Sequence, residues 1–213
     1  MKKKPLVITL LLLVIAGSVT WMYLHQTGGS PNIEMGPYNA LGAVAGEETG
    51  RLLNHKGQVV IIARDYSGGA NPVEEAELKA FSATLAKAGI GIVATERFNI
   101  PQSQILLLGG TIPSEWFVRV VEAHPKVDAL ILLAALPPLD KTASDLLKKS
   151  GTKIVLISSN SSGSQSLLDQ GLAQLALVPR SELPHDTNKP PQTVRELFDR
   201  YYVILEPGKS SSP

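Results

Sequence analysis

The side chains best suited to chemistry come directly after an apolar run that ends at Ala63. They are Arg64, Asp65, Tyr66 and Ser67. A carboxylate and a guanidinium can hydrogen-bond to hydroxyl groups beside an aromatic ring, so this group suits a sugar-like polyol or a protein partner. The alternative is a solvated strand end that binds nothing.

Two further polar groups follow later apolar runs in the same way. Glu96 and Arg97 come after the second apolar run, Ile90 to Ala94. A serine-rich stretch that contains Ser159 and Asn160 comes after the fourth run, Lys153 to Ile157. The carboxyl ends of parallel strands meet at one edge of a sheet, and ligands bind outside that edge. We therefore expect all of these residues on one rim, as candidates for binding a small ligand.

The stretch from Ser67 to Asn71 precedes a predicted helix, whose free amide groups and dipole favour an anion. It matches neither the dinucleotide-binding glycine pattern nor a P-loop with its Lys-Ser/Thr pair. The stretch is therefore either a simple turn with a helix cap or a weak phosphate site.

No catalytic or metal-binding pattern stands out in the sequence. It contains no cysteine, and its four histidines are dispersed without metal-site spacing. The serine-rich stretch lacks the G-x-S-x-G motif of an activated nucleophile. We predict no metal, no cofactor and no enzymatic activity.

Length and charge exclude other classes of protein. The chain has 213 residues and a formal net charge of +1. Setting aside Lys2, Lys3 and Lys4 leaves 17 basic residues against 19 acidic ones, so no basic surface is predicted to hold nucleic acid. About 185 residues remain beyond the N-terminal apolar segment, which is enough for one domain with a core.

The N-terminal apolar segment predicts a membrane anchor. Residues 5–24 carry no charge, and a helix of about 20 residues spans the roughly 30 Å of a bilayer's hydrocarbon. Leu6 and Leu12 would lie in the lipid, Trp21 and Tyr23 suit the interface, and the preceding lysines favour a cytoplasmic N-terminus. A cleaved secretory signal is the alternative, and both interpretations export the rest of the chain.

The sequence divides into four predicted parts. A linker rich in glycine, proline and polar residues separates the anchor from one extracytoplasmic domain, and a polar tail ends the chain. The parts are the anchor over 1–24, the linker over 25–39, the domain over 40–206 and the disordered tail over 207–213.

Several aromatic residues are candidates for either core or interface positions. Trp116 and Phe117 are expected to pack in the core. Phe198, Tyr201 and Tyr202 follow the last βα unit, and we take them as candidates for binding a protein partner.

Apolar runs and helical patterns alternate from Gly57 onward. Val59 to Ala63 predicts a strand buried on both faces, and Asn71-Pro72-Val73-Glu74 predicts a capped helix start with a capping box. The run from Ile90 to Ala94, after Gly89, predicts a second buried strand and completes a parallel βαβ unit. Further segments are a helix over 40–55, strands over 127–134, 153–157 and 172–178, helices from 111 and over 139–150, a polar loop over 158–166, a short helix to 170, a helix over 194–201 and an edge strand over 202–205.

These segments predict an α/β fold with a doubly wound, mostly parallel sheet of about five strands in the order 2-1-3-4-5. The strand that ends in Arg64-Asp65, the helix with LKAFSATLAKAGIGIV and the segment PKVDALILLAALPPL resemble one lobe of the type I periplasmic sugar-binding proteins. The resemblance covers residues 57 to about 178 and implies a Rossmann-like lobe. The family has two such lobes hinged around a ligand, and this chain has room for one.

We therefore predict a single-pass plasma-membrane protein that presents a non-catalytic domain to the periplasm, as an interaction subunit of a membrane protein complex. The alternative is a sugar-like small-ligand binding or sensing lobe, with its site around Asp65 and Ser159. A hydrolase that acts through Ser67 or Ser159 is a second alternative.

Overall fold

A computed structural model of the chain describes residues 14, 18, 21, 34–66, 69, 71–100, 111–157, 161–182 and 190–208. The chain divides into two compact units, Met1–Glu34 and Met35–Pro213. The fold described below belongs to the second unit.

The predicted anchor lies almost wholly outside the described residues. Of residues 1–24, the structure describes Val14, Ser18 and Trp21, all helical, but neither Leu6, Leu12 nor Tyr23. Among the residues it describes, no helix has the length and apolar character needed to cross a membrane. The anchor therefore stays a prediction.

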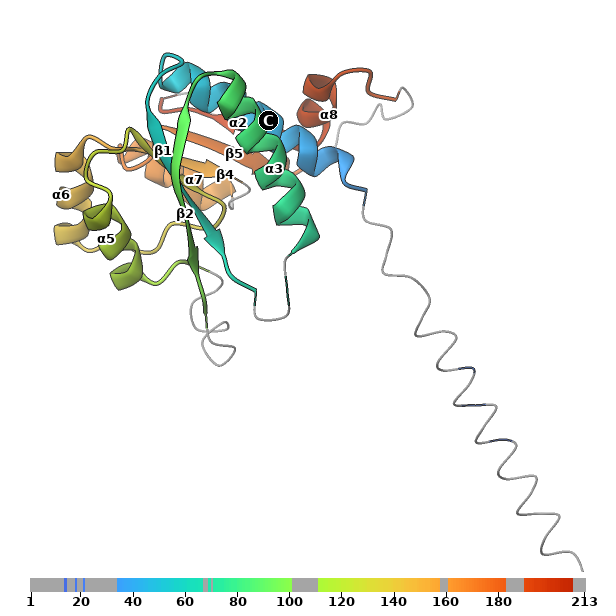
Figure 1. Cartoon of the computed structure of the whole chain (residues 1–213), viewed down its shortest axis with the longest axis horizontal. Coiled ribbons are helices and arrows are strands. Elements are labelled where there is room, and N and C mark those ends of the chain that lie inside the picture. Colours follow the sequence, from blue (N-terminus) through green and yellow to red (C-terminus); the bar gives the residue numbers. More distant parts are fainter. Residues whose placement is uncertain are drawn as a thin grey trace, which may run out of the picture. The chain divides into compact units, whose positions relative to one another are not determined.

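Within the described residues, a six-stranded sheet forms the centre of the second unit (Figure 1). The strands lie in the order β2-β1-β3-β4-β5-β6; the first five are parallel, and β6 pairs with β5 antiparallel. The predicted α/β class, the order of the first five strands and the last edge strand are confirmed. The strands are β1 (Gln58–Arg64), β2 (Gly91–Phe98), β3 (Ala129–Leu132), β4 (Lys153–Ile157), β5 (Leu175–Pro179) and β6 (Tyr202–Leu205).

Helices cover both faces of the sheet (Figure 1). Val59 and Ile61 of β1 belong to one buried cluster, and Val60 and Ile62 belong to the other. A strand covered on both faces buries every side chain, which explains the unbroken apolar run of β1. On the first face lie α2 (Gly36–Leu52), α3 (Pro72–Lys87) and α8 (Val194–Tyr201); on the second lie α5 (Ser114–Ala123), α6 (Lys141–Ser150) and α7 (Ser161–Asp169).

Helix α3 begins where the sequence predicts. The Asn71 side chain accepts a hydrogen bond from the Val73 amide at 3.0 Å, and a proline stands in the first turn. Phe81 and Leu85 on its inner stripe are fully buried. The predicted capping box is wrong, because the Glu74 carboxylate turns to other partners at the rim of the sheet.

Helices α2 and α3 pack closely because small residues of α2 face α3. A Cβ atom at Gly42 would collide with the carbonyl oxygen of Glu77, and one at Gly46 would lie 2.7 Å from Cβ of Thr84. The absence of side chains at these two positions therefore sets the distance between the helices.

Several predicted boundaries are wrong; β3 (Ala129–Leu132), for example, is shorter than the strand predicted over 127–134. Helix α2 begins at Gly36 rather than at residue 40, because Pro37 initiates it inside the predicted linker. It ends at Leu52 rather than at His55, since Asn54 and His55 adopt left-handed backbone conformations. Part of the predicted polar loop, residues 161–166, belongs instead to α7.

Strand β2 is longer and more exposed than predicted. The predicted buried strand ends at Ala94, whereas β2 continues to Phe98. The side chains of Ile92 and Val93 are 37% and 49% exposed. Within the described sheet β2 is an edge strand with β1 as its one neighbour, so the expectation of burial on both faces fails.

An ion-pair cluster ties α8 to α2. Glu48 of α2 is 9% exposed, and its Oε1 accepts hydrogen bonds from Arg51 and from Arg195 of α8, each at 2.9 Å. A buried carboxylate is costly unless it is paired. The two guanidinium groups therefore stabilise Glu48 and hold the C-terminal helix against the domain.

Candidate functional site

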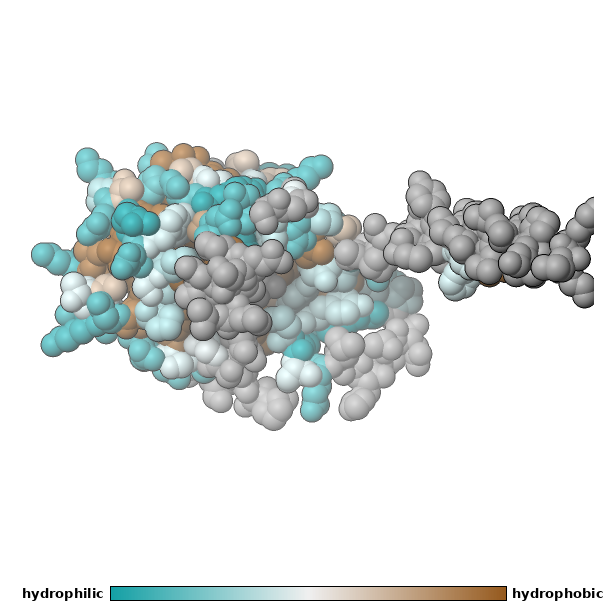
Figure 2. Space-filling model, turned by 90° about the horizontal axis from the view of Figure 1, so that it is seen from below, coloured by the Kyte–Doolittle hydropathy of each residue, from teal (hydrophilic) through white to brown (hydrophobic). Residues whose placement is uncertain are grey.

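The carboxyl ends of β1 and β2 and the start of α3 share one rim, at the lower edge in Figure 1. In this fold, ligands bind at that edge. Figure 2 views the molecule from this side, and most of the described surface visible there is hydrophilic or intermediate, with hydrophobic patches toward the side of α5 and α6. The described surface visible on this side is therefore mainly polar.

Tyr66, Glu74 and Arg97 form a connected group at the rim. The Tyr66 hydroxyl donates to Glu74 Oε2 at 3.2 Å, and Arg97 Nη1 lies 3.7 Å from Glu74 Oε1. Arg97 Nη2 also donates to Glu75 Oε1 at 3.0 Å. Burial raises the pKa of Glu74, while the Tyr66 hydrogen bond and the Arg97 charge act against it. These bonds hold an acid, a phenol and a guanidinium in fixed positions.

Arg64 and Asp65 lie next to this group. The Arg64 guanidinium carbon lies 5.2 Å from the centroid of the Tyr66 ring, within the range of a cation–π contact. The Asp65 amide donates to the Phe98 carbonyl at 2.8 Å, which fixes its backbone against the end of β2. The Asp65 carboxylate is exposed and makes no hydrogen bond within the described part of the chain. Of the predicted rim residues, the structure therefore brings together Arg64, Asp65, Tyr66 and Arg97.

Glu96 does not belong to this group, contrary to the prediction. It lies within β2, opposite Ile62 of β1, and neighbouring residues of a strand point to opposite faces. Its Oε1 lies 2.9 Å from Nε2 of His124, at the end of α5. The prediction failed because the strand was expected to end before Glu96.

Three predicted site residues, Ser67, Ser159 and Asn160, lie outside the described residues. Their role in a ligand site stays a prediction. The hydrolase alternative, which rests on Ser67 and Ser159, also stays a prediction.

Glu74 and Glu77 of α3 were not among the predicted site residues, and Glu77 is the more unusual of the two. It lies one turn after Glu74 on α3, is 4% exposed, and its Oε1 has no hydrogen-bond partner among the described residues. Burial raises the pKa of Glu77 to about 8, and the charge of Glu74 acts in the same direction. One signal was available, because Glu77, Phe81 and Leu85 recur at a spacing of four, so an acid occupies a core position of the helix.

A second aromatic group lies near Glu77. Burial raises the pKa of Tyr202, and the charges of Tyr38 and Glu77 contribute to the increase. The rings of Phe198 and Tyr202 stack with their centroids 5.6 Å apart, and these residues are 1% and 6% exposed. Two of the three predicted partner-binding aromatics are therefore core residues, and the half-buried Tyr201 remains a candidate.

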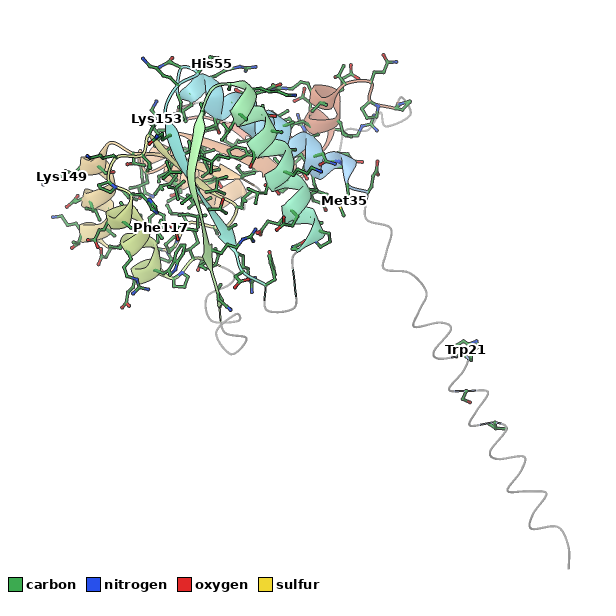
Figure 3. All side chains as sticks on the ribbon, in the orientation of Figure 1. Trp21, Met35, His55, Phe117, Lys149 and Lys153 are labelled. Atoms are coloured by element: carbon green, nitrogen blue, oxygen red, sulfur yellow. The ribbon has the colours of Figure 1, made fainter. Side chains whose placement is uncertain are left out.

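Trp116 and Phe117 behave as predicted. Phe117 is fully buried between α5 and the sheet (Figure 3), and Trp116 packs on Phe98 with the ring centroids 5.6 Å apart.

Three hollows occur away from the rim group. Two lie at the opposite, amino edge of the strands, near Lys153 (Figure 3), with volumes of about 320 and 580 Å³. The third, of about 600 Å³, lies between α5 and α6. None of these three hollows, each lined by described residues, includes a residue of the rim group.

No set of three His, Asp or Glu residues in the described part of the chain could hold a metal ion. The absence of a metal or cofactor in the whole chain stays a prediction.

Comparison with known proteins gives matches in structure but not in sequence. No family model and no curated protein matches the chain. A structure described as "XylFII molecule" matches with a TM-score of 0.52 at 17% identity, over 79% of this chain and 60% of that one. A "XylFII-LytSN complex" structure matches with a TM-score of 0.50 at 20% identity, over 76% of this chain and 52% of that one. AraP, an arabinose-binding protein from Geobacillus stearothermophilus, has a TM-score of 0.49 at 17% identity, over 66% and 45% of the two chains.

The fold is similar to that of the two XylFII structures, with TM-scores of 0.52 and 0.50. The resemblance predicted from the sequence is thereby confirmed at the level of the fold. The chain spans between 45% and 60% of the length of these three structures. The prediction that the domain is not an enzyme stays a prediction.

Proposed function

We propose that this chain is an extracytoplasmic binding lobe for a small, hydroxyl-rich ligand such as a sugar. The ligand would bind at the rim formed by Asp65, Tyr66, Glu74 and Arg97. The observation that supports this most is the grouping of these side chains at the carboxyl edge of a sheet whose fold also occurs in sugar-binding proteins.

The chemistry of the rim suits a polyol. Asp65 can accept hydrogen bonds from sugar hydroxyls, Arg97 can donate them, and the Tyr66 ring offers a flat apolar face. The bonds among Tyr66, Glu74 and Arg97 exist without ligand, so binding orders few side chains. Because Asp65 is exposed, water competes for its hydrogen bonds, and we expect a dissociation constant of about 1 mM.

Residues 1–24 would hold this lobe at the plasma membrane, with the N-terminus in the cytoplasm and the lobe in the periplasm or its equivalent. The support for this is the uncharged segment over 5–24 and the preceding lysines. A domain placed outside the cytoplasm meets extracellular sugars directly.

Thermal unfolding of the detergent-solubilised full chain tests the ligand proposal. At about 100 mM, a sugar with a dissociation constant of about 1 mM should add about 2.7 kcal/mol of stability. For a domain of this size, that corresponds to an increase of roughly 5–10 °C in Tm. Sugars also stabilise proteins by exclusion from their surface, so pairs of epimers are compared at equal concentration.

The proposal expects one epimer to raise Tm more than its pair, and Asp65→Asn to abolish the difference. Asp145→Asn, on the exposed side of α6, removes the same charge far from the rim and should leave the difference unchanged. Equal shifts for all epimers, or equal shifts in wild type and Asp65→Asn, would refute a sugar site at the rim.

A role as an interaction subunit of a membrane complex is the second candidate. It is favoured by a mostly apolar hollow between α5 and α6 rather than at the rim. Gentle extraction of the full chain from its native membrane should then recover stoichiometric partner chains. Recovery of a lone, monodisperse monomer would argue against this role.

A further inference from the structure

Helices α5 and α6 lie side by side on one face of the sheet (Figure 1) and leave a groove of about 600 Å³ along their outer sides. Val118 of α5 and Leu146 of α6 are half-buried there, and Ala143 is buried. Pro138 closes one end. The groove therefore has an apolar floor, which is the usual character of a surface that binds a helix.

The groove is formed without a partner. Ser114 Oγ at the start of α5 donates to the Pro138 carbonyl at 3.0 Å, which joins the beginnings of the two helices. Asp140 caps α6 by accepting the Ala143 amide at 2.7 Å. A ligand thus meets a fixed surface and does not need to order the helices.

The groove carries more acid than base. Glu115, Glu122 and Asp140 line it, against Arg119. Local folding accounts for two of the acids, because Glu115 lies in the first turn of α5 and Asp140 caps α6. It does not account for Glu122, which stands in the last turn of α5, where a helix dipole disfavours a carboxylate and the turn itself contains no basic residue. With three acids against Arg119, the lining keeps an excess of negative charge, which a cation of a partner would compensate.

We propose that the α5–α6 groove docks a short amphipathic helix of a partner protein. Apolar side chains of that helix lie on Val118 and Leu146, and a lysine or arginine lies beside Glu122. Helix α5 has 10 residues, about 15 Å, so the groove matches a partner helix of about ten residues. The proposal does not depend on ligand binding at the rim, which uses other residues.

A pair of synthetic peptides tests this surface. One is a helix of about twelve residues with leucine on one face and lysine on the other, and its pair carries glutamate in place of lysine. Each is labelled and titrated by fluorescence anisotropy with the full chain in a non-ionic detergent, with empty micelles as the blank. The basic peptide should bind and the acidic peptide should not.

Matched variants decide whether the groove is the binding surface. Glu122→Lys and Val118→Asp should each weaken binding of the basic peptide by about tenfold. Glu47→Lys makes the same charge change on an exposed position of α2, on the other face of the sheet, and should leave binding unchanged. Circular dichroism melting verifies that each variant is folded.

Each other result overturns the proposal. Equal binding of both peptides would show unspecific apolar adhesion. Equal weakening by Glu47→Lys and Glu122→Lys would show general charge attraction. Absence of binding by either peptide would show that the groove does not accept an amphipathic helix.

Discussion

At the scale of single residues, Glu77 makes the stability of the domain depend on pH. Its carboxyl group is buried, its Oε1 has no hydrogen-bond partner in the part of the chain that the structure describes, and burial raises its pKa to about 8. The unfolded chain has the lower, ordinary value, so the folded state binds more protons between about pH 4.5 and pH 8. Stability is therefore fully present below about pH 4.5 and is lost as the pH rises toward and through 8.

The prediction is that the free energy of unfolding falls by up to about 1.4 kcal/mol per pH unit in this window because of Glu77. Glu77→Gln cannot ionise, so its unfolding free energy should fall less steeply with pH. Chemical denaturation at several pH values measures both slopes. Glu47→Gln, at an exposed position, should behave as wild type, and identical slopes for all three proteins would contradict a buried, titrating Glu77.

The rim residues show what a sequence can and cannot predict at this scale. The grouping of Arg64, Asp65, Tyr66 and Arg97 follows from the expected meeting of strand ends at one edge. Glu96 was misplaced because β2 continues to Phe98, so Glu96 lies within the strand and points to the opposite face from Arg97. The burial of Glu77 depends on the contact between α2 and α3, and Glu74 finds its partners Tyr66 and Arg97 across the rim; no local pattern encodes either contact.

At the scale of elements, the missing side chain of Gly42 lets α2 and α3 approach each other closely. Gly42→Ala would place a Cβ against the carbonyl oxygen of Glu77, and overpacking of this kind costs about 1–3 kcal/mol. Thermal melting should show a Tm lower by roughly 3–10 °C. Gly163→Ala in α7 meets nothing within 4 Å and should instead add up to about 1 kcal/mol through helix propensity. Equal effects of the two changes would contradict the close approach.

The ion pair between Glu48 and Arg195 predicts how the C-terminal helix detaches. Arg195→Ala removes the bond to α8 but leaves Arg51 on Glu48, so the loss of global stability should be about 1 kcal/mol. Amide hydrogen exchange should become faster in α8 and β6 and stay unchanged in β1. If amide exchange became faster throughout the sheet, the idea that Arg195 stabilises α8 locally would be contradicted.

Element order was predictable because hydrophobic runs and helix caps are local signals. The Asn71 cap and the run from Val59 to Ala63 indicate the βαβ unit. The right-handed crossover rule then limits where the next parallel strand can lie. The exposure of Ile92 and Val93 was not predictable in this way, since it depends on which strand occupies the edge of the finished sheet.

At the scale of the whole molecule, the N-terminal segment is predicted to anchor and orient the chain. Full-length protein should stay with the membrane after alkaline carbonate washing, and protease added outside the inner membrane should digest the domain. Replacing Lys2, Lys3 and Lys4 with glutamate removes the charge bias that retains the N-terminus in the cytoplasm, so a larger share of the domain should become protected. Release of the wild-type chain by carbonate would contradict a retained anchor.

The central claim is that the rim of a sugar-binding-protein-like lobe binds a small polyol. Hydrogen exchange of the full chain, with and without the sugar that stabilises it most, tests this claim most directly because it locates the ligand. With the sugar bound, amide exchange should become slower at the end of β1, the end of β2 and the first turn of α3, and should not change in α5 and α6. Unchanged exchange at the rim, or protection confined to α5 and α6, would contradict it.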